Sequence, residues 1–163
     1  MTLPAGYTID VVRGERTPEL DEELIRFWTG RRALAETAAR ARLGHVVCVL
    51  RDGEGAAAAV NSVFEKNIAE LGGRRFWLYR TLAPSPESRA ALDEMVTATH
   101  KCLEAERQGL RGEPIGICMM VADRETMEHR NEPVWPTSEL MFAGYTSAGE
   151  QLRIVYFDGA RVI

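Results

Sequence analysis

The sequence predicts an α/β fold: a mixed, mostly antiparallel, twisted sheet of about six to seven strands flanked by about four helices. Three observations lead to this prediction. Short apolar or alternating runs typical of strands recur along the chain, helical patterns separate some of them, and Gly-rich or Pro-rich turns mark the boundaries. With 163 residues and 45% hydrophobic content, residues 1–163 are expected to form a single domain around one core.

The first quarter of the chain is predicted to form a strand and two helices. Residues 7–12 alternate as a strand, and Thr17-Pro18-Glu19 then supplies an N-cap, a proline at the first helical position and an acidic first turn. Gly30 ends this helix, and a second helix is predicted at about 31–43. The arginines of the second helix either form a solvated face, which is the commoner outcome, or bind a phosphorylated ligand. They are Arg31, Arg32, Arg40 and Arg42.

A hairpin is predicted next. The continuous apolar run at 45–50 is typical of a strand buried on both sides, and the turn at 51–55 joins it to an antiparallel strand at 57–64. The alanines at 56–59 are equally compatible with a helix, so this second strand depends on Val60, Val63 and Phe64. A loop is expected at 65–73.

The chain is organised around a strand at 74–82 that runs through Pro84 into one long helix ending near Arg107. Large side chains occupy both faces of the strand, which predicts a central position in the sheet. Ser85 is the predicted N-cap of the helix. The turn at 84–90 is either an ordinary capped connection or a phosphate site, because backbone N–H groups and the helix dipole favour an anion there.

The last third of the chain completes the predicted sheet. Residues 114–121 form a strand parallel to the central one, because a helix separates the two. Asp123 can cap a short helix that extends to about Arg130. Residues 139–146 and 151–157 form a terminal hairpin.

Composition argues against several classes of function. A net charge of −4 disfavours a nucleic-acid partner, and no apolar run approaches the ~20 residues that cross a bilayer, so no membrane partner is expected. Together with an N-terminus that lacks a leader pattern, this predicts a cytoplasmic location. The cysteines lack disulfide or ligand spacing and are typical of buried thiols, and the histidines show no ligand spacing, so no metal site is expected: Cys48, Cys102 and Cys118.

The order of these elements resembles that of the GNAT superfamily of acyl-CoA-dependent N-acyltransferases. The most specific parts are the central strand, Phe76-Trp77-Leu78-Tyr79-Arg80-Thr81-Leu82, and the Gly-aromatic step Ala143-Gly144-Tyr145-Thr146. The resemblance covers nearly the whole chain and implies a GNAT-like fold. It also implies transfer of an acyl group from acetyl-CoA, another acyl-CoA or another pantetheine thioester to a small amine or amino-acid-like acceptor. The oligomeric state is open, with a homodimer among the alternatives.

The resemblance further implies a donor site at the end of the central strand. There, backbone groups would bind pantetheine, and a Gln/Arg-x-x-Gly-x-Gly/Ala turn would wrap the pyrophosphate. In this chain that turn reads Ser85-Pro86-Glu87-Ser88-Arg89-Ala90, in which only Ala90 fits and Glu87 adds a repelling charge. The cofactor-binding candidates are Leu82, Ser85, Ser88, Arg89 and Ala90. The alternative function is a non-catalytic GNAT-like ligand-binding or protein-interaction domain that has lost acyl-CoA binding.

Acyl transfer to an amine needs a base for the amine proton and an acid for the departing thiolate. Glu65, expected just past the third strand, is the candidate base, and its alternative is a solvated loop carboxylate. Tyr145 is the candidate acid. The family's usual acid tyrosine lies on the short helix before the last hairpin, and residues 124–130 contain no tyrosine.

Asn61, Trp77 and Arg80 are the substrate-binding candidates. Arg80 shares a predicted strand face with apolar residues, so it either forms a structural ion pair or holds an acidic substrate or phosphate in a cleft. Asn61, in the middle of a strand, is either a satisfied structural amide or points into the same cleft. Trp77 is core or pocket wall.

Overall fold

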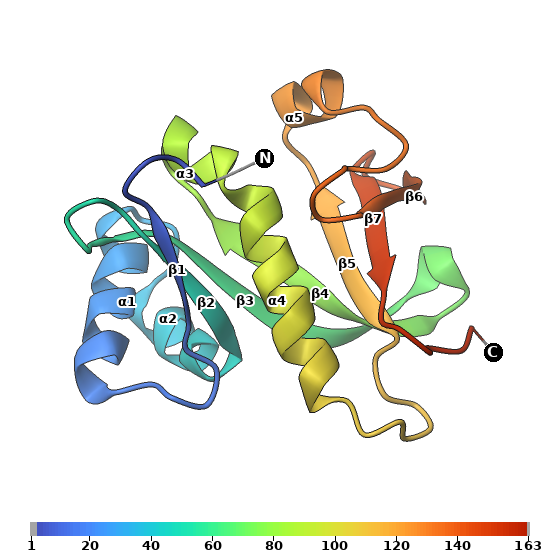
Figure 1. Ribbon diagram of the computed structural model, residues 1–163, viewed down its shortest axis with the longest axis horizontal. Coiled ribbons are helices and arrows are strands. Elements are labelled where there is room, and N and C mark those ends of the chain that lie inside the picture. Colours follow the sequence, from blue (N-terminus) through green and yellow to red (C-terminus); the bar gives the residue numbers. More distant parts are fainter. Residues whose placement is uncertain (1–2, 163) are drawn as a thin grey trace. The chain divides into compact units, whose positions relative to one another are not determined.

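The computed structural model describes residues 3–162 and shows one mixed seven-stranded sheet with five α-helices among those residues (Figure 1). The strand order is β1-β2-β3-β4-β5-β7-β6. The helices and strands have the following bounds: β1 Thr8–Val11, α1 Pro18–Gly30, α2 Glu36–Arg42, β2 Val46–Arg51, β3 Ala57–Ile68, β4 Arg74–Leu82, α3 Pro86–Ala90, α4 Leu92–Glu106, β5 Gly116–Val121, α5 Arg124–His129, β6 Met141–Tyr145 and β7 Gln151–Tyr156.

The strand pairings confirm the predicted mixed, mostly antiparallel sheet. β4 and β5 are parallel, whereas β1 with β2, β2 with β3, β5 with β7 and β6 with β7 are antiparallel. A parallel pair needs a crossover connection, which α3 and α4 supply between β4 and β5.

The chain divides into two compact units. The first comprises the chain up to Val63 together with Arg80–Thr99, and the second comprises Phe64–Tyr79 together with the chain from His100 onward. Three elements, β3, β4 and α4, contribute residues to both units. The single domain expected from the chain's length stays a prediction.

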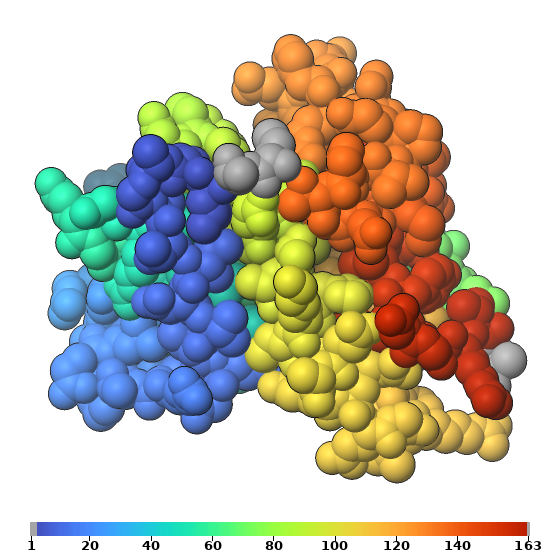
Figure 2. All heavy atoms as spheres, viewed as in Figure 1, coloured from blue at the N-terminus to red at the C-terminus, as the bar shows by residue number. Residues whose placement is uncertain are grey.

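In the first unit, helices cover both faces of the sheet. Leu24, Phe27 and Trp28 of α1 pack with Val49 and Val60 on one face. On the other face, a second apolar cluster contains the following buried residues: Cys48, Leu50, Ala59, Ala91 and Met95. The two clusters follow from strand geometry, because successive side chains of β2 point to opposite faces. In Figure 2 the hairpin turn at 52–55 projects from the surface of this unit.

In the second unit, side chains from the adjacent strands β3, β4, β5 and β7 form the core. It contains Ile68, Phe76, Leu78, Cys118 and Leu152. Gly116 in β5 packs directly against β7, since a Cβ atom at this position would lie 2.2 Å from the carbonyl oxygen of Val155.

Segment 130–140 of the second unit is anchored by Arg153, whose side chain is fully buried. Its guanidinium donates to the carbonyls of Arg130 at 3.1 Å and Glu132 at 2.9 Å, and it lies over the Trp135 ring at 4.4 Å. Arg130 covers the same ring at 3.8 Å. Trp135 is therefore a loop anchor, in contact with two cations.

Three predicted boundaries are wrong for identifiable reasons. The helix predicted at 31–43 begins at Glu36, because Arg32 adopts a left-handed conformation with φ of 56°. β3 continues to Ile68, so the expected loop at 65–73 shrinks to a 3-10 turn and two glycines with positive φ. The long helix is interrupted at Ala91, whose N–H donates to the carbonyl of Ser88 three residues back.

Candidate functional site

A cavity of about 210 Å³ lies in the first unit, beside the last residues of β4. Its apolar wall consists of Trp28 from α1, Ala33 and Leu34 from the following loop, Val60 from β3 and Leu82 from β4. Its polar lining is Arg42, Ser62, Arg80 and Thr81. Among the described residues that line the cavity, none is a carboxylate, so the lining carries positive charge only.

Two guanidinium groups from separate elements line this cavity. Arg42 is the last residue of α2, and Arg80 lies near the end of β4. Burial lowers the pKa of both groups, and the positive charge of Arg42 lowers the pKa of Arg80 further. Two positive charges that repel each other in a partly buried site are stabilised when an anion binds between them. The side of the cavity that carries the charges can therefore bind an oxyanion.

The structure separates the arginines that the sequence presents as one group. Arg40 pairs with Glu36 at 2.9 Å and Glu22 at 3.2 Å on the helix surface. Arg31 donates to the Phe27 carbonyl and lies over the Phe27 ring at 4.2 Å. Only Arg42 of the four lines this cavity. Its place at the end of the helix, directly before buried Leu43, is the signal that could have identified it.

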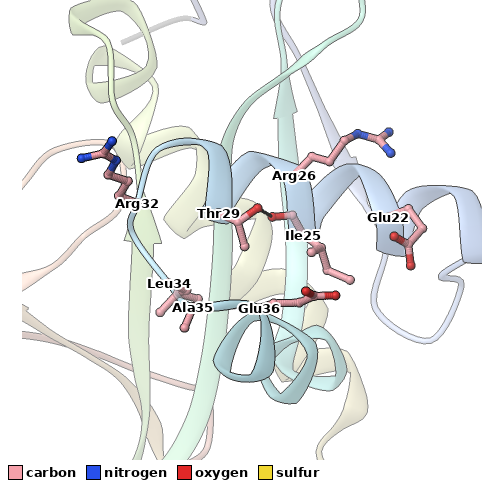
Figure 3. A pocket seen from close by; sticks show the side chains of 8 residues that line it. All are labelled: Glu22, Ile25, Arg26, Thr29, Arg32, Leu34, Ala35 and Glu36. Atoms are coloured by element: carbon pink, nitrogen blue, oxygen red, sulfur yellow. Dashed lines mark hydrogen bonds between the residues drawn. The ribbon is translucent and has the colours of Figure 1, made fainter.

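A second, wider depression of about 620 Å³ lies between α1 and the segment that enters α2 (Figure 3). Its charges are mixed: Arg26 and Arg32 line it together with Glu22 and Glu36. Arg32 and Glu22 lie toward opposite ends in Figure 3, and Thr29 donates to the carbonyl of Ile25 at 2.8 Å. This balance of charge favours no particular ligand, so the smaller cavity is the better candidate site.

Asn61 faces the other side of the sheet from the cavity, whose lining includes its two strand neighbours, Val60 and Ser62. Its side chain is fully buried. Its Oδ1 accepts from Thr99 Oγ1 at 3.0 Å and from Cys48 Sγ at 3.4 Å, and its Nδ2 lies 3.4 Å from the Arg80 carbonyl. The structure therefore brings Asn61 into a buried hydrogen-bond network and does not bring it to the cavity.

The turn predicted to hold a pyrophosphate is closed by a capping box. Ser85 Oγ accepts from the Ser88 N–H at 3.1 Å, and Ser88 Oγ accepts from the Ser85 N–H at 3.0 Å. The Arg89 N–H donates to the Ser85 carbonyl, and Pro86 has no N–H to offer. These bonds occupy backbone donors that an anion at this turn would need. Arg89 itself is exposed and donates to the Pro84 carbonyl at 3.3 Å, and Ala90 is exposed.

Glu65, Trp77 and Tyr145 belong to the second unit. Glu65 lies within β3, not in the loop predicted for it, and pairs with Arg75 at 3.1 Å. Trp77 is half-buried in β4, in register with Ile117. Tyr145 ends β6 with 60% of its surface exposed, and its ring packs edge-on against Phe142 at 5.3 Å. Their catalytic and substrate-binding roles stay predictions.

Residues 3–162 contain no helix that is both long and apolar enough to span a membrane. Within the same described part of the chain, no three His, Cys, Asp or Glu side chains gather closely enough to hold a metal ion.

Comparison with known proteins relates the chain to others by structure alone, since no family model and no curated protein sequence matches it. A GNAT-family acetyltransferase from Bacillus cereus aligns with a TM-score of 0.54 and 7% identity, over 93% of this chain and 97% of its own. One from Streptococcus agalactiae aligns with a TM-score of 0.56 and 10% identity, over 96% and 99%. One from Listeria monocytogenes aligns with a TM-score of 0.50 and 13% identity, over 93% and 95%. Nearly complete mutual coverage, together with the strand order, shows that this chain has the fold of the GNAT acetyltransferases, in a divergent form.

Proposed function

We propose that this protein is an N-acyltransferase that moves an acyl group from coenzyme A, or another pantetheine thioester, to a small amine. The observation that carries the proposal is the polar cavity beside the end of β4, lined by Arg80, Thr81 and Leu82. A concave site that combines apolar walls with a few charged and hydroxyl side chains is typical of small-molecule binding. The GNAT fold supplies the reaction class, as an analogy of fold.

The proposed reaction forms a bond from the amine nitrogen to the thioester carbonyl carbon and breaks the carbon–sulfur bond. The amine proton passes to a base and the thiolate takes a proton from an acid. Glu65 is the proposed base, which requires its ion pair with Arg75 to open, and Tyr145 is the proposed acid. Leu82 and Arg89 are the proposed donor contacts, since Arg89 is exposed and able to reach a phosphate.

The capping box favours a second candidate function, a ligand-binding domain without acyl transfer. With Ser85 and Ser88 bonded to each other, the turn offers a pyrophosphate fewer backbone donors than an open turn would. In that case the cavity would still bind its small ligand, but no thioester would approach it.

Thermal unfolding of the purified protein with millimolar acetyl-CoA, longer acyl-CoAs or free coenzyme A separates the two functions. A ligand at about 100 times its Kd adds roughly 2.7 kcal/mol, which raises the Tm of a chain this size by about 5–10 °C. ATP serves as the control that carries phosphates without pantetheine. No shift with any coenzyme A compound would refute a CoA-dependent transferase. A shift would then be followed by amine acylation assays of Glu65→Gln and Tyr145→Phe.

A further inference from the structure

We propose that the cavity holds the negatively charged group of the acceptor between Arg42 and Arg80, so that the substrate is a small amine bearing a carboxylate or a phosphate. The description of this molecule as an acceptor rests on the proposed function. The oxyanion site itself rests only on the cavity and its lining.

The charge of the cavity lining favours an anionic ligand. Two arginines and two hydroxyl residues, Ser62 and Thr81, supply the polar part of the lining, and its described residues include no carboxylate. A guanidinium is always charged and presents donors in a planar fork that matches carboxylate or phosphate oxygens. A polyamine would meet only like charge at this wall, which disfavours it as the acceptor.

The two arginines are carried by packed elements of the fold. Arg42 and Arg80 stand on elements whose apolar side chains pack in one cluster: buried Ala39 of α2 and partly buried Leu82 of β4. Backbone positions fixed by a packed core hold the two arginines closer to their binding positions than a mobile loop would, so less freedom is lost when they bind an anion. The two elements that carry the arginines are therefore in place before the ligand arrives.

The cavity is small. About 210 Å³ is less than the roughly 300–1,000 Å³ of pockets that hold drug-sized ligands. Buried Trp28 and the apolar residues Leu34 and Leu82 line the cavity together with the two arginines. These dimensions suit a compact molecule with a short spacer between its amine and its oxyanion.

Isothermal titration at low salt with two matched pairs of amines tests this inference. O-phosphoethanolamine is compared with ethanolamine, and β-alanine with propylamine, so that each pair differs chiefly by its anion. We expect the members with an anion to bind and the others to bind at least tenfold more weakly. Arg42→Gln and Arg80→Gln should each weaken binding of the anionic amine by roughly tenfold to a hundredfold, the usual effect of losing charged hydrogen bonds. Arg124→Gln, at an exposed helix position in the second unit, is the matched control and should bind like the wild type.

The outcomes also distinguish the two proposals. Equal binding within each pair, or unchanged binding in a folded Arg42→Gln variant, overturns the oxyanion site. Weaker coenzyme A binding in Arg42→Gln, with the amines unaffected, assigns the arginine to the donor and overturns it as well. Arginine-dependent binding of the anionic amines without any response to acyl-CoA supports the site while refuting the transferase. If Arg80→Gln fails to fold, the Arg42→Gln titration still decides.

Discussion

Replacement of Asn61 by alanine should destabilise the protein strongly while leaving the cavity's ligand binding intact. Asn61 lies fully buried on the face of β3 that packs toward Thr99 and Cys48, away from the cavity. Its carboxamide accepts from two side chains and lies within donor distance of the Arg80 carbonyl. The substitution removes all of these contacts at once.

The magnitude follows from the individual contacts. The 3.0 Å bond from Thr99 Oγ1 contributes about 1 kcal/mol, and the three contacts at 3.4 Å, from Cys48 and to the Ser62 and Arg80 carbonyls, contribute less each. Buried partners left unsatisfied and the void left by the carboxamide add roughly 1–2 kcal/mol. We therefore expect a loss of about 3 kcal/mol, or a Tm lower by about 6–12 °C for a chain of this length.

The assay is denaturant and thermal unfolding of Asn61→Ala beside Asn67→Ala. Asn67 lies on the same strand but is exposed, with its Oδ1 accepting from the exposed Arg75 side chain at 3.3 Å, so its loss should cost less than about 0.5 kcal/mol. A double-mutant cycle with Thr99→Ala should show coupling of at least about 0.5 kcal/mol, because the two residues share a hydrogen bond.

A structural role for Asn61 is refuted if Asn61→Ala unfolds within 2 °C, roughly 1 kcal/mol, of the wild type. It is also refuted if the folded variant loses binding of O-phosphoethanolamine, because that result would restore Asn61 as a substrate contact.

Three further perturbations test other parts of the structure. Arg153→Met should cost about 3–5 kcal/mol in urea unfolding, because it leaves the carbonyls of Arg130, Glu132 and buried Leu140 without their charged donor; a loss below 1 kcal/mol would contradict the anchor role. Gly116→Ala should lower the free energy of unfolding by ~1–3 kcal/mol or more, because the added Cβ would meet the Val155 carbonyl. Gly30→Ala, where a Cβ meets open space, is the control and should be nearly neutral in the same melts. Burial and, to a smaller extent, a nearby carboxylate raise the pKa of Cys118 from 9.0 to about 12. The contribution of the neutral thiol to the free energy of unfolding is therefore fully present below pH 9. That contribution should fall from pH 9 towards 12 by up to ~1.4 kcal/mol per pH unit, and Cys118→Ala should show a correspondingly weaker alkaline loss of stability.

Local sequence patterns, each spanning only a few residues, predicted most of the fold. The N-caps at Thr17, Ser85 and Asp123 lie where the sequence places them, and each side chain accepts from the backbone three residues on. The parallel strand after the long helical stretch was also predicted, because a crossover connection allows that direction. Boundaries failed where the backbone left ordinary geometry, as at Arg32 with its positive φ.

The candidate site could be predicted only in part. Arg80 was singled out as a charge on an otherwise apolar strand face, and Leu82 by its place at the end of the central strand; both line the cavity. Ser85 and Ser88 lie in the predicted turn, but no local rule says whether a serine hydroxyl faces a ligand or caps its neighbour. Glu65 was expected in a loop, whereas it lies in β3 and pairs with Arg75.

The sequence by itself determined the order of the elements, their caps and the direction of the strands, since these depend on contacts between residues close in the chain. Tertiary structure alone decided which of the clustered arginines enters a cavity and to which face Asn61 points. A shift of one residue in strand register reverses every side chain, and the partners that hold the register come from distant segments. For the same reason the charged wall of the cavity, Arg42 from α2 beside Arg80 from β4, exists only once the helix has packed on the sheet.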